Sequence, residues 1–220
     1  MPFDGSVTVI LLCQHRLSFS RALESVLSQT YQNLEIVVVQ DGCPNSDTPL
    51  LLDNYCKHKN CRCIEGFARS DPRVHYLKSP QCIGYGKGYL RNLAIANSTA
   101  PYIAYLDDDN WWQPEHIESL LSVLHSWTNF AWSGARLWDN GERVGNRINA
   151  VPCRNGIDTS EIMHHRHLTD QVGGWADREK AHWPFLRLDQ DWELVRRFLS
   201  AGYKGYHLDK LTVNYQVNQP

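Results

Sequence analysis

Short apolar runs alternate with helical patterns over the first half of the chain. The β-branched runs Val7–Leu12 and Leu34–Val39 have the composition of strands that are buried on both faces. Between them, apolar residues recur at helical spacing, and Ser18 is a candidate N-cap for that helix. The pattern therefore predicts a strand, a helix and a second strand in succession.

The same alternation continues along the chain as far as residue 124. The next elements expected are a Leu-rich helix over Thr48–Lys57, a strand over Val74–Leu77, a helix over Gly84–Asn97 and a strand over Pro101–Leu106. Pro114 then suits the first turn of another helix. The buried stripe of that helix is expected to consist of Ile117, Leu120, Leu121 and Leu124.

This order of strands and helices predicts an α/β fold, with a mostly parallel sheet covered by helices on both sides. In such sheets, ligands bind beyond the carboxyl ends of the strands. Arg16, Asp41 and the triplet Asp107–Asp109 each follow a predicted strand. These side chains are therefore expected to converge on one crevice.

The alternation fails after Trp138. Residues 139–190 are expected to hold polar loops and a few short strands. A last helix is predicted over Asp191–Ala201, closed by Gly202. A terminal pair of strands is expected over Lys204–His207 and Leu211–Val217. At this length, the chain is predicted to form a single domain.

Composition narrows the possible partners. The chain has 220 residues with a formal net charge of −2, so it lacks the basic footprint of a nucleic-acid-binding protein. Its apolar stretches are too short to span a bilayer, and its start lacks the charged segment of a signal peptide. We therefore expect a cytoplasmic protein, at most peripheral to a membrane.

The seven cysteines are an odd number, which fits a reduced compartment better than a disulfide framework. A subset of them lies close together in sequence, with His58 and His75 nearby. The subset is Cys56, Cys61, Cys63 and Cys82. Because these cysteines do not form two matched C-x-x-C pairs, ordinary reduced thiols are favoured, and structural zinc is the open alternative.

Three successive carboxylates, Asp107–Asp109, end a predicted buried strand. Their mutual repulsion requires a cation or a hydrogen-bonded ligand as compensation. Mg²⁺ and Mn²⁺ prefer oxygen ligands, and proteins often hold Mg²⁺ with one or two carboxylates plus substrate phosphates. The alternative is a solvated acidic turn, but the apolar residues Leu106 and Trp111–Trp112 on either side of the triplet indicate an enclosed site. The triplet therefore predicts a site for metal and diphosphate.

Neighbouring residues separate the enzyme classes that use such a site. Trp111 stands where a haloacid-dehalogenase-type phosphatase has threonine, and Cys13–Arg16 is not the glycine-rich loop of a nucleotidyltransferase. In the glycine run Gly84–Gly88, Lys87 is not followed by the Ser or Thr of a Walker loop. This run is expected to bring the backbone close to a ligand at a helix N-terminus.

Several segments, in matching order and spacing, resemble family 2 glycosyltransferases of the GT-A fold. The resemblance covers nearly the whole chain, from the first strand onwards. It is carried by Ala22–Tyr31, Leu34–Gly42, Gly88–Ile95, Tyr105–Asp109, Val172–Trp175 and Asp189–Leu194.

The resemblance implies roles for residues on the donor side. Asp41 would contact the nucleotide base, most often uracil. Asp109 would coordinate Mn²⁺ or Mg²⁺ at the diphosphate, while Asp107 or Asp108 would touch the ribose or the donor sugar. Lys87 and Arg91 lie where basic side chains reach the diphosphate, although Arg91 has a structural helix residue as its alternative role.

On the acceptor side, the resemblance makes Asp191 the catalytic base. Gln190 replaces the glutamate that usually precedes this aspartate, so Asp189 is the rival base, and a helix-capping role for Asp191 is the alternative. Gly173–Trp175 resembles the loop that leads to the acceptor pocket, with a tight turn and a core tryptophan as its alternative. The polar run His164–His167 is expected to be a solvated loop, with acceptor contact or metal ligation as the alternative.

The implied activity is an inverting, metal-dependent transfer from a nucleotide sugar, with UDP-sugars favoured, to a carbohydrate or lipid-linked acceptor. Residues 1–112 would form the donor half and residues 113–220 the acceptor and base half. A sugar nucleotidyltransferase of similar fold and a catalytically silent nucleotide-binding domain are the alternatives. The oligomeric state is left open.

Overall fold

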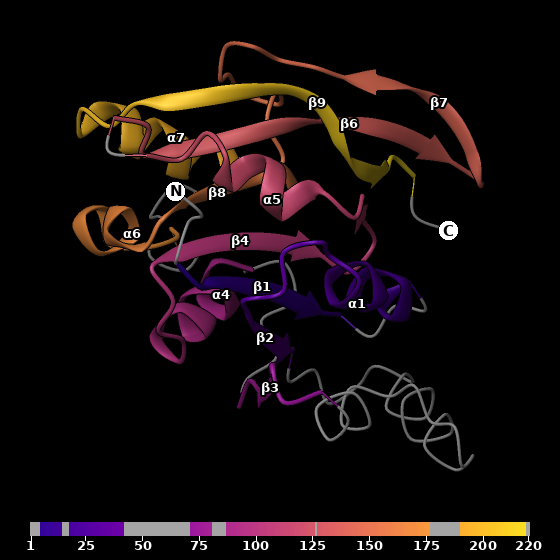
Figure 1. The fold of residues 1–220 in the computed structure, drawn as a ribbon, viewed down its shortest axis with the longest axis horizontal. Helices are drawn as coiled ribbons and strands as arrows, with labels where there is room; N and C mark the ends of the chain where they lie inside the picture. Colours follow the sequence, from indigo (N-terminus) through magenta and orange to yellow (C-terminus); the bar gives the residue numbers. More distant parts are fainter. Residues whose placement is uncertain are drawn as a thin grey trace, which may run out of the picture.

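One continuous mixed sheet organises the chain. The computed structural model describes residues 5–14, 18–41, 71–80, 87–125, 127–176 and 190–218. In these ranges, nine strands form a sheet of order β3-β2-β1-β4-β8-β6-β9-β5, and β7 pairs with β6 (Figure 1). The strands are β1 (Val7–Cys13), β2 (Leu34–Gln40), β3 (Val74–Lys78), β4 (Tyr102–Asp107), β5 (Trp111–Trp112), β6 (Phe130–Asp139), β7 (Glu142–Arg147), β8 (Ile162–His165) and β9 (Gly205–Gln216).

Helices cover both faces of this sheet. They are α1 (Phe19–Leu27), α4 (Lys87–Ala96), α5 (His116–Leu121), α6 (Arg166–Val172) and α7 (Gln190–Ser200), with a 3₁₀ turn η1 (Thr159–Glu161) before β8. Val9 and Leu11 of β1 pack in a core with α1 and α5. Ile10 and Leu12 pack in a second core with α4, α6 and α7. Because alternate strand residues face opposite layers, all seven residues of β1 are buried, and all of them except Thr8 are apolar.

Strands β3, β2, β1 and β4 run parallel, as the alternation of strands and helices predicts. Cys13 of β1 is in register with Gln40 of β2, and Leu12 is in register with Asp107 of β4. The carboxyl ends of β1, β2 and β4 therefore meet at one edge of the sheet. The α/β fold class is confirmed. Strand β8 pairs antiparallel with β4 and β6, and β7 pairs antiparallel with β6.

Helix α5 has the predicted buried stripe at Ile117, Leu120 and Leu121, and Leu124, three residues beyond the end of the helix, is buried as well. The helix begins at His116, two residues later than Pro114. Helix α7 agrees with the prediction to within one residue at each end, and Gly202 follows it at φ +87°. Ser18 occupies the N-cap of α1 with helical backbone angles (φ −67°, ψ −17°), so it does not have the extended geometry of a side-chain cap.

The C-terminal third contains more regular structure than the polar pattern indicates. The predicted pair of terminal strands is wrong: β9 is one strand that runs beside β6, with register shifts opposite Ser133–Ala135. Leu208 and Leu211 flank this irregularity. A bulge of this kind interrupts the alternation of apolar and polar residues without ending the strand. The expectation of a solvated His164–His167 loop is also wrong, since this segment forms the end of β8 and the start of α6.

Some predictions fall on residues outside the described ranges. These are the helix over Thr48–Lys57, the cysteines at positions 56, 61, 63 and 82, residues His15 and Arg16, the glycine run at 84–86, and Asp189.

Candidate active site at the carboxyl edge of the sheet

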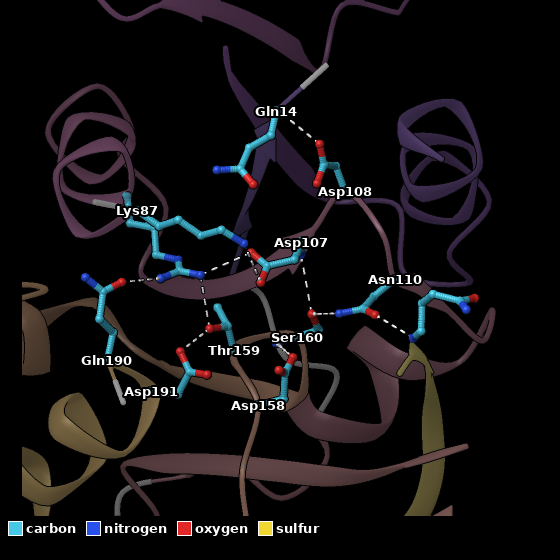
Figure 2. A network of polar contacts seen from close by, with 12 residues as sticks. Gln14, Lys87, Asp107, Asp108, Asn110, Asp158, Thr159, Ser160, Gln190 and Asp191 are labelled. Carbon is cyan, nitrogen blue, oxygen red and sulfur yellow. Dashed lines mark hydrogen bonds and ion pairs between the residues drawn. The ribbon is translucent and has the colours of Figure 1, made fainter. Parts of the chain in front are cut away.

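The ends of β1, β2 and β4 bring the predicted donor-side aspartates together. The backbone N–H of Asp41 donates to the carbonyl of Cys13 at 3.1 Å, which fixes the end of β2 beside the end of β1. The backbone N–H of Gln14 donates to Asp108 Oδ2 at 2.7 Å (Figure 2). Asp41 and Asp108 are both buried. The expected convergence is therefore observed for Asp41 and the triplet.

Asp107 is held between two cations from α4. Lys87 Nζ lies 3.3 Å from Asp107 Oδ2, and an Arg91 guanidinium nitrogen lies 3.1 Å from Oδ1 (Figure 2). Burial favours the neutral carboxyl, but Lys87 and Arg91 outweigh it and lower the pKa of Asp107 to about 2. The carboxylate therefore stays ionised, and its charge is compensated by groups of the protein itself.

Arg91 is enclosed rather than exposed to the crevice. Arg91 is 2% exposed, and its guanidinium carbon lies 4.3 Å from the ring centroid of Trp175. Besides Asp107, it donates to Thr159 Oγ1 at 3.1 Å and to Gln190 Oε1 at 3.4 Å. These contacts favour the structural alternative for Arg91. The side chain of Lys87 remains partly exposed, at 23%.

The loop after the triplet is tied to two other parts of the chain. Asn110 Nδ2 donates to Ser160 Oγ at 2.9 Å, and Asn110 Oδ1 accepts from the backbone N–H of Gln216 at 3.0 Å. Trp112 Nε1 donates to the carbonyl of Ser160 at 2.8 Å. Asp109 is 9% exposed. It therefore lies in a loop that the hydrogen bonds of Asn110 and Trp112 hold in place.

Asp191 lies at the start of α7, on the other side of Thr159 from Asp107 (Figure 2). The hydroxyl of Thr159 donates to Asp191 Oδ1. Burial and the nearby charge of Asp158 raise the pKa of Asp191 to about 7, although Arg91 and Thr159 act in the opposite direction. A carboxyl group with a pKa near neutrality can both accept and release a proton at physiological pH.

The turn that supplies Asp158 and Thr159 was missed as part of the site. Asp158 caps η1: its side chain accepts from the Ser160 N–H at 2.9 Å, and Glu161 Oε2 accepts from the Asp158 N–H at 2.9 Å. This reciprocal pair is a capping box, and the spacing Asp158-x-x-Glu161 is its sequence signal. Burial raises the pKa of Glu161 to about 8, despite an opposing effect of Arg147, whose guanidinium lies 3.0 Å away.

The loop Gly173–Trp175 is hydrogen-bonded to α4. Asn92 Nδ2 donates to the carbonyl of Trp175 at 2.9 Å, and the Trp175 N–H donates to Asn92 Oδ1 at 2.8 Å. The ring of Trp175 is 2% exposed and contacts Tyr105 edge to face, with centroids 5.0 Å apart. Trp175 therefore lies in the core, as in the tight-turn alternative, and joins the site through Arg91.

His164 belongs to the core as well. Its Nε2 lies 2.8 Å from the Tyr105 hydroxyl, and its Nδ1 lies 2.8 Å from the carbonyl of His165. Burial lowers the pKa of His164 to about 3, so the imidazole is neutral. Arg166, the next basic residue, donates to the carbonyls of Ala100 and Ile95 at 2.6 and 3.0 Å. His164 therefore joins β8 to β4, and Arg166 joins α6 to α4 and to the segment before β4.

The donor set fits a hard divalent cation that is shared with a substrate. Among the residues that the structure describes, no three His, Cys, Asp or Glu side chains are grouped to hold a metal ion by themselves. Asp107 is paired with two cations, and Asp108 Oδ2 accepts from the Gln14 N–H. One carboxylate plus phosphate oxygens is a usual arrangement for Mg²⁺, so the geometry is compatible with Asp109 as its protein ligand.

The parallel strands of the sheet end in a carboxylate cluster, and Asp191, a carboxyl group of raised pKa, lies across Thr159 from it. The family model described as Glycosyl transferase family 2 matches residues 9–208, and the chain belongs to this family. Its fold class and its family are those expected from the sequence.

Individual relatives agree with this assignment. The chain is 33% identical over 202 residues to the glycosyl transferase WcaA of Escherichia coli, a match that covers 90% of the chain and 67% of the relative. It is 29% identical over 125 residues to the glycosyltransferase GlyA of Streptococcus pneumoniae, covering 56% of the chain. That second match spans only 16% of GlyA.

Two solved structures share the fold. The mannosyltransferase PcManGT of Pyrobaculum calidifontis, in complex with GDP-Man and Mn²⁺, matches 99% of the chain with a TM-score of 0.70 and 15% identity. TarS of S. aureus, in complex with UDP-GlcNAc, matches 98% of the chain with a TM-score of 0.68 and 14% identity. The chain covers 59% of each of these two structures. Among the described helices, none has the length and apolar character of a membrane span.

Proposed function

We propose that this chain transfers a sugar from a nucleoside-diphosphate sugar, with UDP-sugars as the favoured donors, to an acceptor hydroxyl with inversion at the anomeric carbon. The observation that carries the proposal is the relation between Asp191 and the triplet. Asp191 has a raised pKa, and it lies across Thr159 from the cation-paired Asp107. A base on one side and a diphosphate site on the other are what a single displacement requires.

The donor-side residues have separate roles in this proposal. Asp41, at the end of β2, contacts the nucleotide base, and Asp108 with Asp107 contacts the ribose or the donor sugar. Lys87 reaches the diphosphate while it remains paired with Asp107. Asp109 holds Mn²⁺ or Mg²⁺, which when bound neutralises charge on the departing diphosphate.

Arg91 and Trp175 are buried and act through the residues that contact the substrates. Arg91 fixes Asp107 through their ion pair, and Trp175 supports both Arg91 and the Gly173–Trp175 loop on the acceptor side. Residues 1–112 form the donor half and residues 113–220 the acceptor half. The donors bound by TarS and PcManGT, UDP-GlcNAc and GDP-Man, support a nucleotide sugar, and the Mn²⁺ in PcManGT supports a divalent metal.

In the transfer step, the Asp191 carboxylate accepts the proton of the acceptor hydroxyl. The hydroxyl oxygen forms a bond to the anomeric carbon, while the bond from that carbon to the diphosphate oxygen breaks. The electron pair of the broken bond leaves with the nucleoside diphosphate. Because the pKa of Asp191 is near 7, the group is a stronger base than an ordinary carboxylate and is still ionised in about half of the molecules at neutral pH.

The test is a panel of UDP- and GDP-sugars with carbohydrate and lipid-linked acceptors, in Mn²⁺, Mg²⁺ or EDTA. Release of nucleoside diphosphate and transfer of sugar are measured for the wild type, Asp191→Asn and Asp170→Asn. Asp170 is an exposed aspartate of α6, so its substitution makes the same chemical change away from the site. We expect Asp170→Asn to keep the wild-type rate and Asp191→Asn to lose at least a hundredfold.

Other outcomes would contradict the proposal in distinct ways. Nucleotide binding without turnover across the panel would favour a catalytically silent domain, and release of pyrophosphate would favour a nucleotidyltransferase. A product anomer with the configuration of the donor, seen by NMR, would rule out the single displacement. A wild-type rate for Asp191→Asn would remove Asp191 as the base.

A further inference from the structure

Thr159 lies between the two charged parts of the site and is 1% exposed. Its hydroxyl oxygen is 3.1 Å from an Arg91 guanidinium nitrogen, and the hydroxyl also contacts Asp191 Oδ1 (Figure 2). A guanidinium can only donate hydrogen bonds, so Thr159 must accept from Arg91. The single hydroxyl proton of Thr159 is therefore directed at the Asp191 carboxylate.

The other contacts of Arg91 make this arrangement rigid. Its guanidinium is held by Asp107 at 3.1 Å and by Gln190 at 3.4 Å, and it lies over the Trp175 ring. Thr159 itself begins the capped turn η1, so its backbone is fixed by the reciprocal hydrogen bonds of Asp158 and Glu161. Neither Thr159 nor Arg91 can rotate without breaking several contacts at once.

We infer that Thr159 is a positioning residue for the reaction: its hydroxyl orients the Asp191 carboxylate and couples that carboxylate to the ion pair of Arg91 and Asp107. This inference rests on the proposed function, because it assigns Thr159 a role only if Asp191 is the base. The hydroxyl proton occupies one lone pair of Oδ1, so the remaining carboxylate lone pairs are left to receive the acceptor proton. Orientation of this kind is what a general base requires before transfer.

Asp191 is surrounded by groups with opposing effects. Asp158 and Thr159 approach it from η1, Arg91 from α4 and Asp107 from β4, while Gln190 precedes it on α7. The two carboxylates favour the protonated form of Asp191, whereas Arg91 and the Thr159 hydroxyl favour the ionised form. Removing the Thr159 hydroxyl should therefore raise the pKa of Asp191 further and also leave its orientation less defined.

The test compares Thr159→Val, which keeps the shape of the side chain and removes the hydroxyl, with Thr159→Ser, which keeps the hydroxyl. Thr169→Val is the matched control: Thr169 is also buried, and its hydroxyl donates to the carbonyl of Arg166 within α6. For each variant, kcat and the donor KM are measured from pH 5 to 9, together with Tm. The acid limb of kcat reports the pKa of the base in the substrate complex.

For Thr159→Val, we expect kcat at its plateau to fall about tenfold or more and the acid limb to move upward by about one pH unit, with the donor KM within about twofold. Thr159→Ser should restore both kcat and the acid limb. Thr169→Val should leave both unchanged. A purely structural role would lower Tm without moving the acid limb.

The inference and the proposed function fail in different ways. An active wild type whose Thr159→Val variant keeps its rate and its acid limb would overturn the inference alone. The same holds if Thr159→Ser is as impaired as Thr159→Val, because the hydroxyl would then not be the cause. A wild type without transferase activity on any donor would overturn the proposed function, and the role of Thr159 with it.

Discussion

Arg91 and Asp107 form an ion pair with a separation of 3.1 Å, and their side chains are only 3% and 14% exposed. Removal of water from two charges is costly, and it is compensated here by further contacts of both partners. Asp107 has a second cation in Lys87, and Arg91 has Thr159, Gln190 and the Trp175 ring. The pair therefore connects the carboxylate triplet to the neighbourhood of Asp191.

Arg91→Met should destabilise the protein because it leaves Asp107 buried with one cation in place of two. We expect the free energy of unfolding to fall by about 3 kcal/mol, measured by urea denaturation at pH 7. Arg91→Lys keeps the charge but loses the planar fork, and its loss should be smaller. A decrease below about 1 kcal/mol for Arg91→Met would show that the pair contributes little to stability.

Asp191 should make stability depend on pH in the direction opposite to an ordinary salt-bridged aspartate. Its pKa rises from 3.8 to about 7 on folding, so between these values the native state binds more protons than the unfolded state. The free energy of unfolding contributed by Asp191 therefore falls as pH rises from about 4 to 7. Asp191→Asn removes this dependence.

The measurement is urea denaturation of the wild type and Asp191→Asn at pH 4.5 and pH 8. Relative to the wild type, the variant should gain about 2 kcal/mol on going to the higher pH, after allowance for solvent screening of a partly exposed group. Asp170→Asn, at an exposed position, should show no such gain. An equal stability difference at both pH values would contradict a raised pKa for Asp191.

Asp109→Ala should abolish metal-dependent binding of nucleotide diphosphate. Calorimetric titration of UDP or GDP into the wild type should show tighter binding with Mn²⁺ than with EDTA, whereas the variant should bind equally weakly in both. Asp170→Ala is the control for loss of one negative charge. Equal affinity of the wild type with and without Mn²⁺ would refute the assignment of Asp109.

The two glycines before Trp175 should differ in their tolerance of a side chain. Both have positive φ, +82° for Gly173 and +74° for Gly174. A Cβ at Gly174 would lie 2.5 Å from Asn92 Oδ1, whereas a Cβ at Gly173 meets no described atom within 4 Å. Gly173→Ala should cost about 1–2 kcal/mol of backbone strain, and Gly174→Ala about 1 kcal/mol more.

Urea denaturation of both glycine variants measures this difference. Because Asn92 bonds both the N–H and the carbonyl of Trp175, a displaced Asn92 would also release the Gly173–Trp175 loop. Asn92→Ala combined with Gly174→Ala should therefore cost less than the sum of the two single changes. Additive costs would show that the clash with Asn92 is not the cause.

The sequence predicts the strands of the donor half and the position of the triplet, since these depend on local properties. In the run Leu34–Val39 every residue except Glu35 is apolar, which is the composition of a strand that is buried on both faces. Parallel strands place their carboxyl ends at one edge, so the sequence predicts that Asp41 and Asp107 meet there. The spacing Asp158-x-x-Glu161 indicates a capping box from the sequence, but nothing local connects that turn to the site.

What the sequence alone determined is therefore the order of the described elements up to β4, the family and the aspartates that end the strands. Only the tertiary structure decided that Arg91 and Trp175 are buried, that His164 lies in the core, and that Thr159 contacts Asp191. The contacts of Arg91 join residues 16, 68 and 99 positions apart, and Thr159 is 32 positions from Asp191. The physical reason is that pKa and hydrogen bonding depend on burial and on neighbours within a few ångströms, and folding sets both through distant parts of the chain.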